Sequence, residues 1–330
     1  FDRYKKKEGA PPRLELVLPG QERFPASLLA RQAALLDRVD EVRNLVNTPA
    51  SELTPDHFTE RILALAGPEI SCRVLRRTEL ERERMAGILA VGAGSPVEPA
   101  LIRLEYAPTQ ATRSVALIGK GVTFDAGGLN LKPGTAMEEM KSDMAGAAAV
   151  LGTVLAARDR ALPVRVTGWL PLAENLPGRN AVKPGDILRF ANGKTVEIVN
   201  TDAEGRLLLA DALIAAGREK PEWMISLSTL TGAMVAALGD QFAGLLCRSP
   251  RLGAALLAAG ERTRERLWAM PLHDGYRGDI RSQVADLKNA NYHGASALKA
   301  GLFLEEFAGR APLAHLDIAG TAFLSKANRL

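Results

Sequence analysis

The chain has 330 residues, of which 47% are hydrophobic and 24% charged, so it can bury the large core of an ordinary folded protein. Its 42 basic and 38 acidic residues leave a net charge of only +4, which excludes a typical nucleic-acid-binding protein. Two widely separated cysteines exclude a disulfide-stapled fold and indicate free thiols in a reducing cytoplasm. The longest nearly apolar run, Met144 to Ala157, is too short to cross a membrane, and no signal peptide is visible.

The N-terminal region predicts a linker followed by two helices. Residues 1–24 combine a lysine run with glycine and prolines, and we interpret them as the remnant of a preceding region, with residues 25–330 as the main domain. Because the chain opens with Phe1, we expect further residues to have preceded it. Apolar residues at helical spacing predict a helix over residues 25–45. A second helix is expected to start with Thr54 as N-cap and Pro55 at its first position.

From Ser114 onward, strands alternate with helices. Strands are predicted over residues 114–119, 164–170, 223–230 and 313–318, with helices over 137–157 and 207–216. Asn192-Gly193 between two short β-rich runs, 189–191 and 195–200, predicts a hairpin. This alternation predicts an α/β fold with a mostly parallel mixed sheet sandwiched between helices. Ligands of such folds bind beyond the carboxyl ends of the strands.

Three segments place polar residues at those positions. They are GKGVTFDAGG (residues 119–128, followed by Lys132), KSDM (141–144) and NTDAEGR (200–206). Each segment alone has a plain structural explanation, because glycines make tight turns and acidic residues favour helix N-termini.

Taken together, the segments predict a metal site. Four carboxylates are expected to meet at one edge of the sheet: Asp125, Asp143, Asp202 and Glu204. Like charges in a confined cleft raise each other's pKa unless cations intervene. Lys120, Lys132 and Arg206 offset part of this charge, whereas two divalent metals offset it better and supply hydrolytic chemistry. Oxygen-rich ligation suits Mg²⁺, Mn²⁺ or Zn²⁺, and the chain has no H-E-x-x-H motif.

These motifs resemble the signatures of the leucyl aminopeptidase (cytosol aminopeptidase) family of dinuclear-metal exopeptidases. GKGVTFDAGG, KSDMAGAA and NTDAEGRLLLADAL carry the resemblance. Weaker similarities are RNLVNTPASELTP, the AEN of residues 173–175, STLTGAMVAALG and AHLDIAGTAF. The resemblance spans residues 40 to 325 and implies the catalytic domain of that family, with a phosphorylase/hydrolase-like fold of the zinc-exopeptidase type. The family's N-terminal domain is missing from this sequence.

The resemblance also implies a role for each site residue. Asp125 and Glu204 would bridge two metals, Asp202 would complete the tighter site, and Lys120 with Asp143 would complete the exchangeable site. Lysine binds a metal only as the neutral amine, so the pKa of Lys120 must be strongly lowered by the metals.

The remaining roles concern the substrate. Lys132 would polarise the scissile carbonyl, and Arg206 would hold a bicarbonate ion that serves as general base. The pocket and backbone contacts would come from four further residues: Met140, Thr229, Leu230 and Gly232. Ala126 and Ala145 replace the usual serine and glycine outside the ligand set. Lys299 replaces a small polar residue and is expected to alter the pocket wall.

The sequence therefore predicts a metal-dependent aminopeptidase, of broad leucine type, that cleaves peptides with water activated by two metals. Zn²⁺ or Mn²⁺, or else Mg²⁺, are the expected cofactors. We expect a cytoplasmic homo-oligomer, either a hexamer or a trimer, with peptide substrates and no membrane or nucleic-acid partner. Two alternatives remain: another dinuclear hydrolase, such as a phosphoesterase, and a DNA-binding or scaffolding protein with a relic site.

Overall fold

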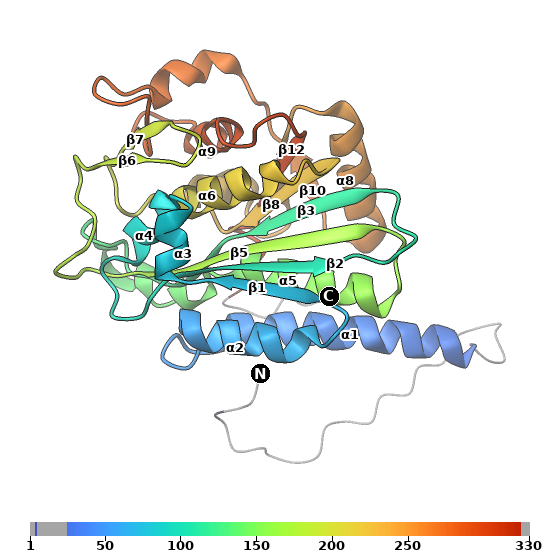
Figure 1. Ribbon diagram of the computed structural model, residues 1–330. Helices are drawn as coiled ribbons and strands as arrows, with labels where there is room; N and C mark the ends of the chain where they lie inside the picture. The colour runs from blue at the N-terminus through green and yellow to red at the C-terminus, as the bar shows by residue number, and fades with distance from the viewer. Residues whose placement is uncertain (1–3, 5–24, 325–330) are drawn as a thin grey trace.

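Figure 1 shows a computed structural model that describes residue 4 and residues 25–324. A nine-stranded sheet lies between two layers of helices, as the alternation of strands and helices predicted. The linker expected over residues 1–24 lies almost entirely outside the described residues. Among the described residues, no helix is both long and apolar enough to span a bilayer.

The central sheet is mixed. In spatial order its strands are β1 (Ser71–Leu75), β2 (Ala100–Tyr106), β5 (Arg165–Asn175), β3 (Ser114–Gly119), β8 (Trp223–Ser228), β12 (Leu313–Asp317), β9 (Ala243–Cys247) and β10 (Leu267–Ala269). A further strand, β4 (Gly121–Asp125), pairs with the far end of β5. The β5–β3, β3–β8 and β8–β12 pairs are parallel, whereas β1–β2, β2–β5 and β12–β9 are antiparallel. The parallel centre therefore brings the carboxyl ends of several strands to one edge.

One face of the sheet is covered by α5 (Ala145–Asp159) and α2 (Pro55–Ala66), with α1 (Ala26–Asn47) packed against α5 (Figure 1). Helix α2 begins as predicted, because the Thr54 side chain accepts from the His57 N–H and Pro55 occupies the first position. The small residues of α5 permit close approach, so the amide of Ala147 donates to the carbonyl of Lys120 at 2.8 Å.

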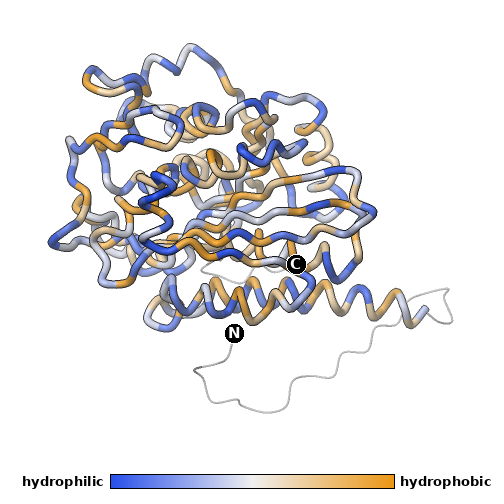
Figure 2. Tube along the Cα trace, viewed as in Figure 1, coloured by the Kyte–Doolittle hydropathy of each residue, from blue (hydrophilic) through white to orange (hydrophobic). Residues whose placement is uncertain are grey.

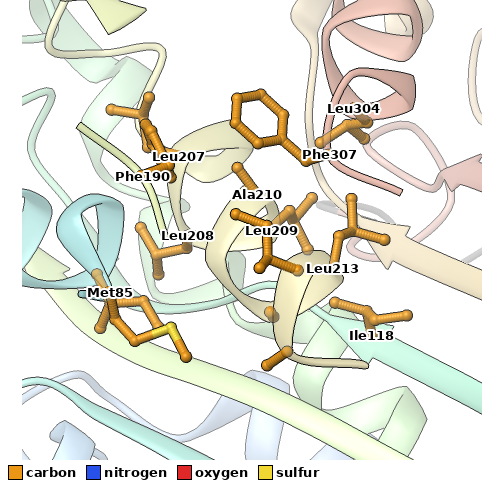
Figure 3. Packing of buried hydrophobic residues seen from close by; sticks show 14 of the residues in the cluster. Met85, Ile118, Phe190, Leu207, Leu208, Leu209, Ala210, Leu213, Leu304 and Phe307 are labelled. Atoms are coloured by element: carbon orange, nitrogen blue, oxygen red, sulfur yellow. The ribbon is translucent and has the colours of Figure 1, made fainter. Parts of the chain in front are cut away.

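The opposite face is covered by α4 (Ala86–Gly92), α6 (Gly205–Arg218) and α9 (Ser296–Glu305), with α3 (Arg77–Arg82) beside α4. Figure 3 shows Leu207, Leu208, Leu209 and Leu213 of α6 packed among residues of the neighbouring elements. Figure 2 shows hydrophobic stretches along the strands of the sheet and hydrophilic residues interspersed along the outer helices. Two more helices, α7 (Gly232–Leu238) and α8 (Pro250–Thr263), adjoin β9.

The predicted hairpin is present. It joins β6 (Ile187–Arg189) to β7 (Thr195–Glu197), and Gly193 adopts a φ of +89° in the turn. Strand β11 (Leu287–Lys288) adds to β7 and completes a small second sheet.

Some predicted boundaries were wrong. The helix expected from Met137 begins only at Ala145, and residues 134–137 and 140–142 form 3₁₀ turns instead. The chain must turn there because the N-terminus of α5 bonds to the carbonyl that follows β3. Strand β5 continues five residues beyond its predicted end, to Asn175, where it pairs with β4. Strand β8 ends at Ser228, which leaves residues 229–231 as a loop.

Candidate metal centre

The acidic residues predicted from the three segments lie together where β3, β4 and β8 end and α6 begins. Asp125 is the last residue of β4, and Lys120 joins β3 to β4. Asp143 lies in the turn before α5, and Asp202 and Glu204 directly precede α6. Oxygens of Asp125, Asp143 and Glu204 all lie within 4.8 Å of one another, and all three side chains are buried. The tertiary fold therefore concentrates charges that are far apart in the sequence.

Lys120 lies at the centre of one half of this cluster. Its Nζ is 2.7 Å from Asp143 Oδ1 and 2.8 Å from Glu204 Oε1, and it donates to the carbonyl of Thr229 at 3.0 Å. Burial lowers the pKa of Lys120, but the charges of Asp143, Glu204 and Asp125 outweigh burial and raise it above its ordinary value. The carboxylates alone thus keep Lys120 protonated, and ligation of a metal by its amine requires the metal to displace that proton.

Lys132 neutralises the other half. Its Nζ lies 2.9 Å from Asp125 Oδ2 and 2.6 Å from Asp202 Oδ1, on the loop that follows β4. Burial lowers the pKa of Lys132, and the neighbouring carboxylates raise it further than burial lowers it. Lys132 is therefore a permanent cation at the rim of the cluster, where its side chain keeps 15% exposure.

The carboxylates are under electrostatic strain. Burial raises the pKa of Asp143 and of Glu204 above their ordinary values, and the charge of Asp125 adds to both effects. Burial and Asp125 likewise raise the pKa of Asp202. Groups of this kind are stabilised when cations share the site.

The side chains present fit a metal centre. Asp143 Oδ2 is buried and has no hydrogen-bond partner within the described part of the chain, so a ligating oxygen is free. The donors are carboxylate oxygens together with one amine, a set that suits hard or borderline divalent cations. These residues can therefore hold divalent ions in place of the protons and ammonium groups that balance the charge.

Arg206 occupies the first turn of α6. Burial lowers the pKa of Arg206 to about 10, with Glu204 and Asp317 opposing the shift, so the guanidinium is charged at neutral pH. Its central carbon lies 5.9 Å from the Phe303 ring centroid, and its buried Nε has no hydrogen-bond partner among the described residues. The guanidinium thus keeps a donor available for an anion.

The predicted substrate-contacting residues are only partly brought to the cluster. Thr229 Oγ1 donates to Asp143 Oδ1 at 2.7 Å, which places the loop after β8 beside the carboxylates. Leu230 follows in this loop, and Gly232 opens α7 with free space where a Cβ would stand. Met140 lies in the 3₁₀ turn before Asp143. The Met140 carbonyl accepts a hydrogen bond from the Asp143 amide at 3.4 Å, which ties this turn to the backbone of one of the cluster's acidic residues.

Lys299, the predicted residue of the pocket wall, lies in α9. It is 2% exposed, and its Nζ contacts the carbonyl of His293 and lies 2.7 Å from Asp279 Oδ2. These bonds hold the loop around His293 rather than placing the ammonium in the carboxylate cluster.

Sequence reasoning missed two buried polar residues that support the site. Asn175 donates to Asp125 Oδ1 at 2.8 Å. Asp317 accepts from the Leu230 amide at 3.2 Å and from Thr231 Oγ1 at 2.7 Å. The AEN and AHLDIAGTAF similarities include these residues, but the local sequence does not show which partners they meet.

Comparisons with known proteins agree with this geometry. The family described as "Cytosol aminopeptidase family, catalytic domain" matches residues 40–329. The "Probable cytosol aminopeptidase" of Geobacter sulfurreducens is 49% identical over 333 residues, which cover 99% of this chain and 67% of that protein. The protein of the same description from Leifsonia xyli subsp. xyli is 46% identical over 98% of this chain and 68% of its own length.

Solved structures show the same fold. The bottromycin maturation enzyme BotP in complex with Mn matches with a TM-score of 0.91 and 40% identity, over 99% of this chain and 71% of that chain. A second structure of BotP matches with a TM-score of 0.89 at the same identity.

Proposed function

The chain belongs to the cytosol aminopeptidase family, and from this membership we propose how its buried cluster works as the centre of a metal-dependent aminopeptidase. The main observation in support is that three buried carboxylate oxygens, one each from Asp125, Asp143 and Glu204, all lie within 4.8 Å of one another. The two alternatives, a phosphoesterase and a DNA-binding protein with a relic site, are not favoured by the family match.

We assign two divalent ions to the cluster. Asp125 and Glu204 would bridge both ions, Asp202 would complete the tighter site, and Asp143 with Lys120 would complete the exchangeable one. The ions are Zn²⁺ or Mn²⁺, with Mg²⁺ as a further candidate, and the Mn complex of the structural neighbour favours Mn²⁺. When bound, such ions polarise a carbonyl and acidify water at neutral pH.

The chain's own residues would orient the peptide. Asp143 Oδ2 has no hydrogen-bond partner among residues 25–324 and is a suitable acceptor for the substrate α-amine, which would restrict cleavage to the N-terminal residue. Met140, Leu230 and Gly232 would border the first side chain and the adjacent backbone, with Thr229 holding this loop against Asp143.

Two cations would act on the reacting groups. Lys132 remains protonated, and its ammonium would donate to the scissile carbonyl oxygen as negative charge develops there. Arg206 would hold bicarbonate through its guanidinium, and bound bicarbonate would supply the general base of the reaction. The charged state of Arg206 supports this role, as does its Nε, which bonds to no other part of the described chain.

Further assignments remain part of the proposal. Residues 1–24 would form a linker and residues 25–330 the catalytic domain, and the match over residues 40–329 supports this domain assignment.

We propose a cytoplasmic homo-oligomer, a hexamer or a trimer. The exposed apolar side chains along α1 are consistent with subunit contacts: Leu28, Leu29, Leu36 and Val39. Light scattering of the purified protein tests the assembly, and a monomer at micromolar concentration contradicts it.

The decisive experiment measures hydrolysis of leucine p-nitroanilide by metal-stripped protein before and after addition of Mn²⁺ or Zn²⁺. We expect metal to restore activity in the wild type and not in Glu204→Gln. Glu219→Gln is the matched control, because Glu219 caps the opposite end of α6 and pairs with Arg103 and Arg165 away from the cluster. A Glu204→Gln variant with wild-type activity contradicts the assignment. Cleavage of p-nitrophenyl phosphate in place of the anilide supports the phosphoesterase alternative.

A further inference from the structure

Asn175 is the last residue of strand β5 and lies beside the last residue of β4. It pairs in register with Asp125, and the amide of Ala126 donates to the Asn175 carbonyl at 2.9 Å. The Asn175 side chain is 2% exposed. A buried amide of this kind needs hydrogen-bond partners for both of its N–H groups.

Both donors of Asn175 have partners in the metal centre. Nδ2 donates to Asp125 Oδ1 at 2.8 Å and to the carbonyl of Thr201 at 3.1 Å. Both partners are acceptors, so the NH₂ end of the amide must face them. Thr201 directly precedes Asp202, and one side chain therefore connects the β4 carboxylate to the segment that carries Asp202 and Glu204.

These bonds determine which carboxylate oxygen of Asp125 faces the rest of the cluster. Oδ1 also accepts from the Gly127 amide at 2.9 Å, so two donors saturate it. Oδ2 is thereby turned toward Lys132, at 2.9 Å, and toward the rest of the cluster. Rotation of the carboxylate would break both bonds to Oδ1.

The surrounding backbone leaves space for this arrangement. Gly128 has a φ of +64°, and a Cβ there would lie 2.8 Å from Asn175 Oδ1 and 3.0 Å from Thr201 Oγ1. The second glycine of the FDAGG motif therefore avoids a collision with Asn175 as well as permitting the left-handed turn. On the opposite side of the strand, Ser95 Oγ bonds Glu174 at 2.5 Å and anchors the end of β5.

We propose that Asn175 is a positioning residue for metal binding, which holds the Asp125 carboxylate at a fixed angle and distance from the Asp202 segment. This inference rests on the proposed roles of Asp125 and Asp202 as ligands. Because Asp125 is assigned to both ions, loss of Asn175 should weaken both binding steps rather than one. Residues that hold a ligand in place typically contribute about 10- to 100-fold to metal affinity.

The test is chelator competition for Mn²⁺ or Zn²⁺ with wild type, Asn175→Ala and Asn175→Ser, together with thermal unfolding of the metal-free proteins. We expect both dissociation constants to rise about 10- to 100-fold in Asn175→Ala. Activity lost at limiting metal should return as the metal concentration is raised. Ser226→Ala is the control, because it removes a buried hydrogen bond to His315 in the same sheet. It should lower the unfolding temperature without changing metal affinity.

Two results would overturn the inference: metal affinity within twofold of wild type in a folded Asn175 variant, or an equal loss of affinity in Ser226→Ala. If Asn175→Ala does not fold, Asn175→Ser decides by the same criteria, since a single hydroxyl hydrogen cannot donate to both Asp125 and the Thr201 carbonyl. Failure of the wild type to bind two ions would instead contradict the proposed metal centre itself, so the two failures are distinguishable.

Discussion

Thr229 holds one carboxylate oxygen of Asp143 in place. The Thr229 hydroxyl donates to Asp143 Oδ1 at 2.7 Å, and the same oxygen lies 2.7 Å from Lys120 Nζ. The second oxygen, Oδ2, has no hydrogen-bond partner in the described structure. Two donors thus fix the orientation of a buried carboxylate and leave one of its oxygens free.

Replacement of Thr229 by valine should weaken the exchangeable metal site. Valine has the same shape but cannot donate, and a hydrogen bond to a charged group contributes about 1.5–3 kcal/mol. We expect the metal concentration for half-maximal activity to rise about tenfold or more, as measured by titrating metal into stripped protein. Thr229→Ser, which keeps the hydroxyl, should remain within about threefold of the wild type. An unchanged metal requirement in Thr229→Val would refute the orienting role.

Gly205→Ala should lower both stability and activity by displacing Lys120. A Cβ on Gly205 would lie 2.6 Å from Cε and 2.8 Å from Nζ of Lys120, so the lysine must move out of the cluster. Asp143 and Glu204 would then lose the cation that neutralises them, and breaking a buried ion pair costs about 3–5 kcal/mol, more than the gain of about 1 kcal/mol that alanine brings over glycine within a helix. We therefore expect a thermal midpoint of the metal-free protein below that of the wild type, with most metal-restored activity lost.

The control for this variant lies on the same helix. A Cβ on Gly217 would meet only the carbonyl of Ala308, at 3.5 Å, which is an ordinary contact. Gly217→Ala should therefore keep wild-type activity. Full activity in Gly205→Ala would show that the position of Lys120 is not critical.

Lys132→Met should reduce kcat about 10²- to 10³-fold and change KM much less, since its ammonium is proposed to act on charge that develops during the reaction. Lys132→Arg restores the charge and should recover part of the loss. Steady-state kinetics with saturating metal, checked for metal content, measure the effect. A change confined to KM would assign Lys132 to substrate binding alone.

His315 should make the folded state sensitive to acid. Burial, reinforced by the charge of Arg206, lowers its pKa to about 3, and its Nδ1 bonds Ser226 Oγ at 2.8 Å. The unfolded histidine titrates near pH 6.5, so below that pH the unfolded chain gains a proton that the folded chain excludes. Stability is therefore complete above about pH 6.5 and is lost as the pH falls toward about 3.

The expected loss is about 2 kcal/mol between pH 6.5 and pH 5. Urea unfolding of metal-free protein at about pH 7.5 and about pH 5 measures it. In His315→Asn the difference between the two pH values should shrink by this amount. An unaltered pH dependence in His315→Asn would show that His315 is not the group responsible.

Strongly patterned elements could be predicted from the sequence. Helix α2 has an N-cap threonine and a proline at its first position, and the Asn192-Gly193 hairpin has the required turn residues, so local chemistry fixes both. The start of α5 could not be predicted, because residues 137–144 have helical character but tertiary bonds to the end of β3 turn them away from a continuous helix. Tertiary contacts overrode local propensity there.

The candidate site was likewise predictable where local sequence determines it and not where tertiary contacts do. Its acidic residues follow strands or precede a helix, and this local placement predicted that they would converge. Asn175 and Asp317 were missed because their roles depend on which strands are neighbours. Asn175 reaches Asp125 only through the β4–β5 register, and Asp317 reaches the loop after β8 only because β12 lies beside β8.

The position of β12 has a consequence for the order of assembly. Asp317, in the last strand, bonds Leu230 and Thr231, whose loop supports Asp143 through Thr229. The loop that supports Asp143 is therefore secured only once β12 has docked beside β8. Metal capture should come late during refolding, after most helix has formed. Stopped-flow circular dichroism, run beside a fluorescent zinc indicator, would reveal this delay, and simultaneous signals would show that the site forms without the final strand.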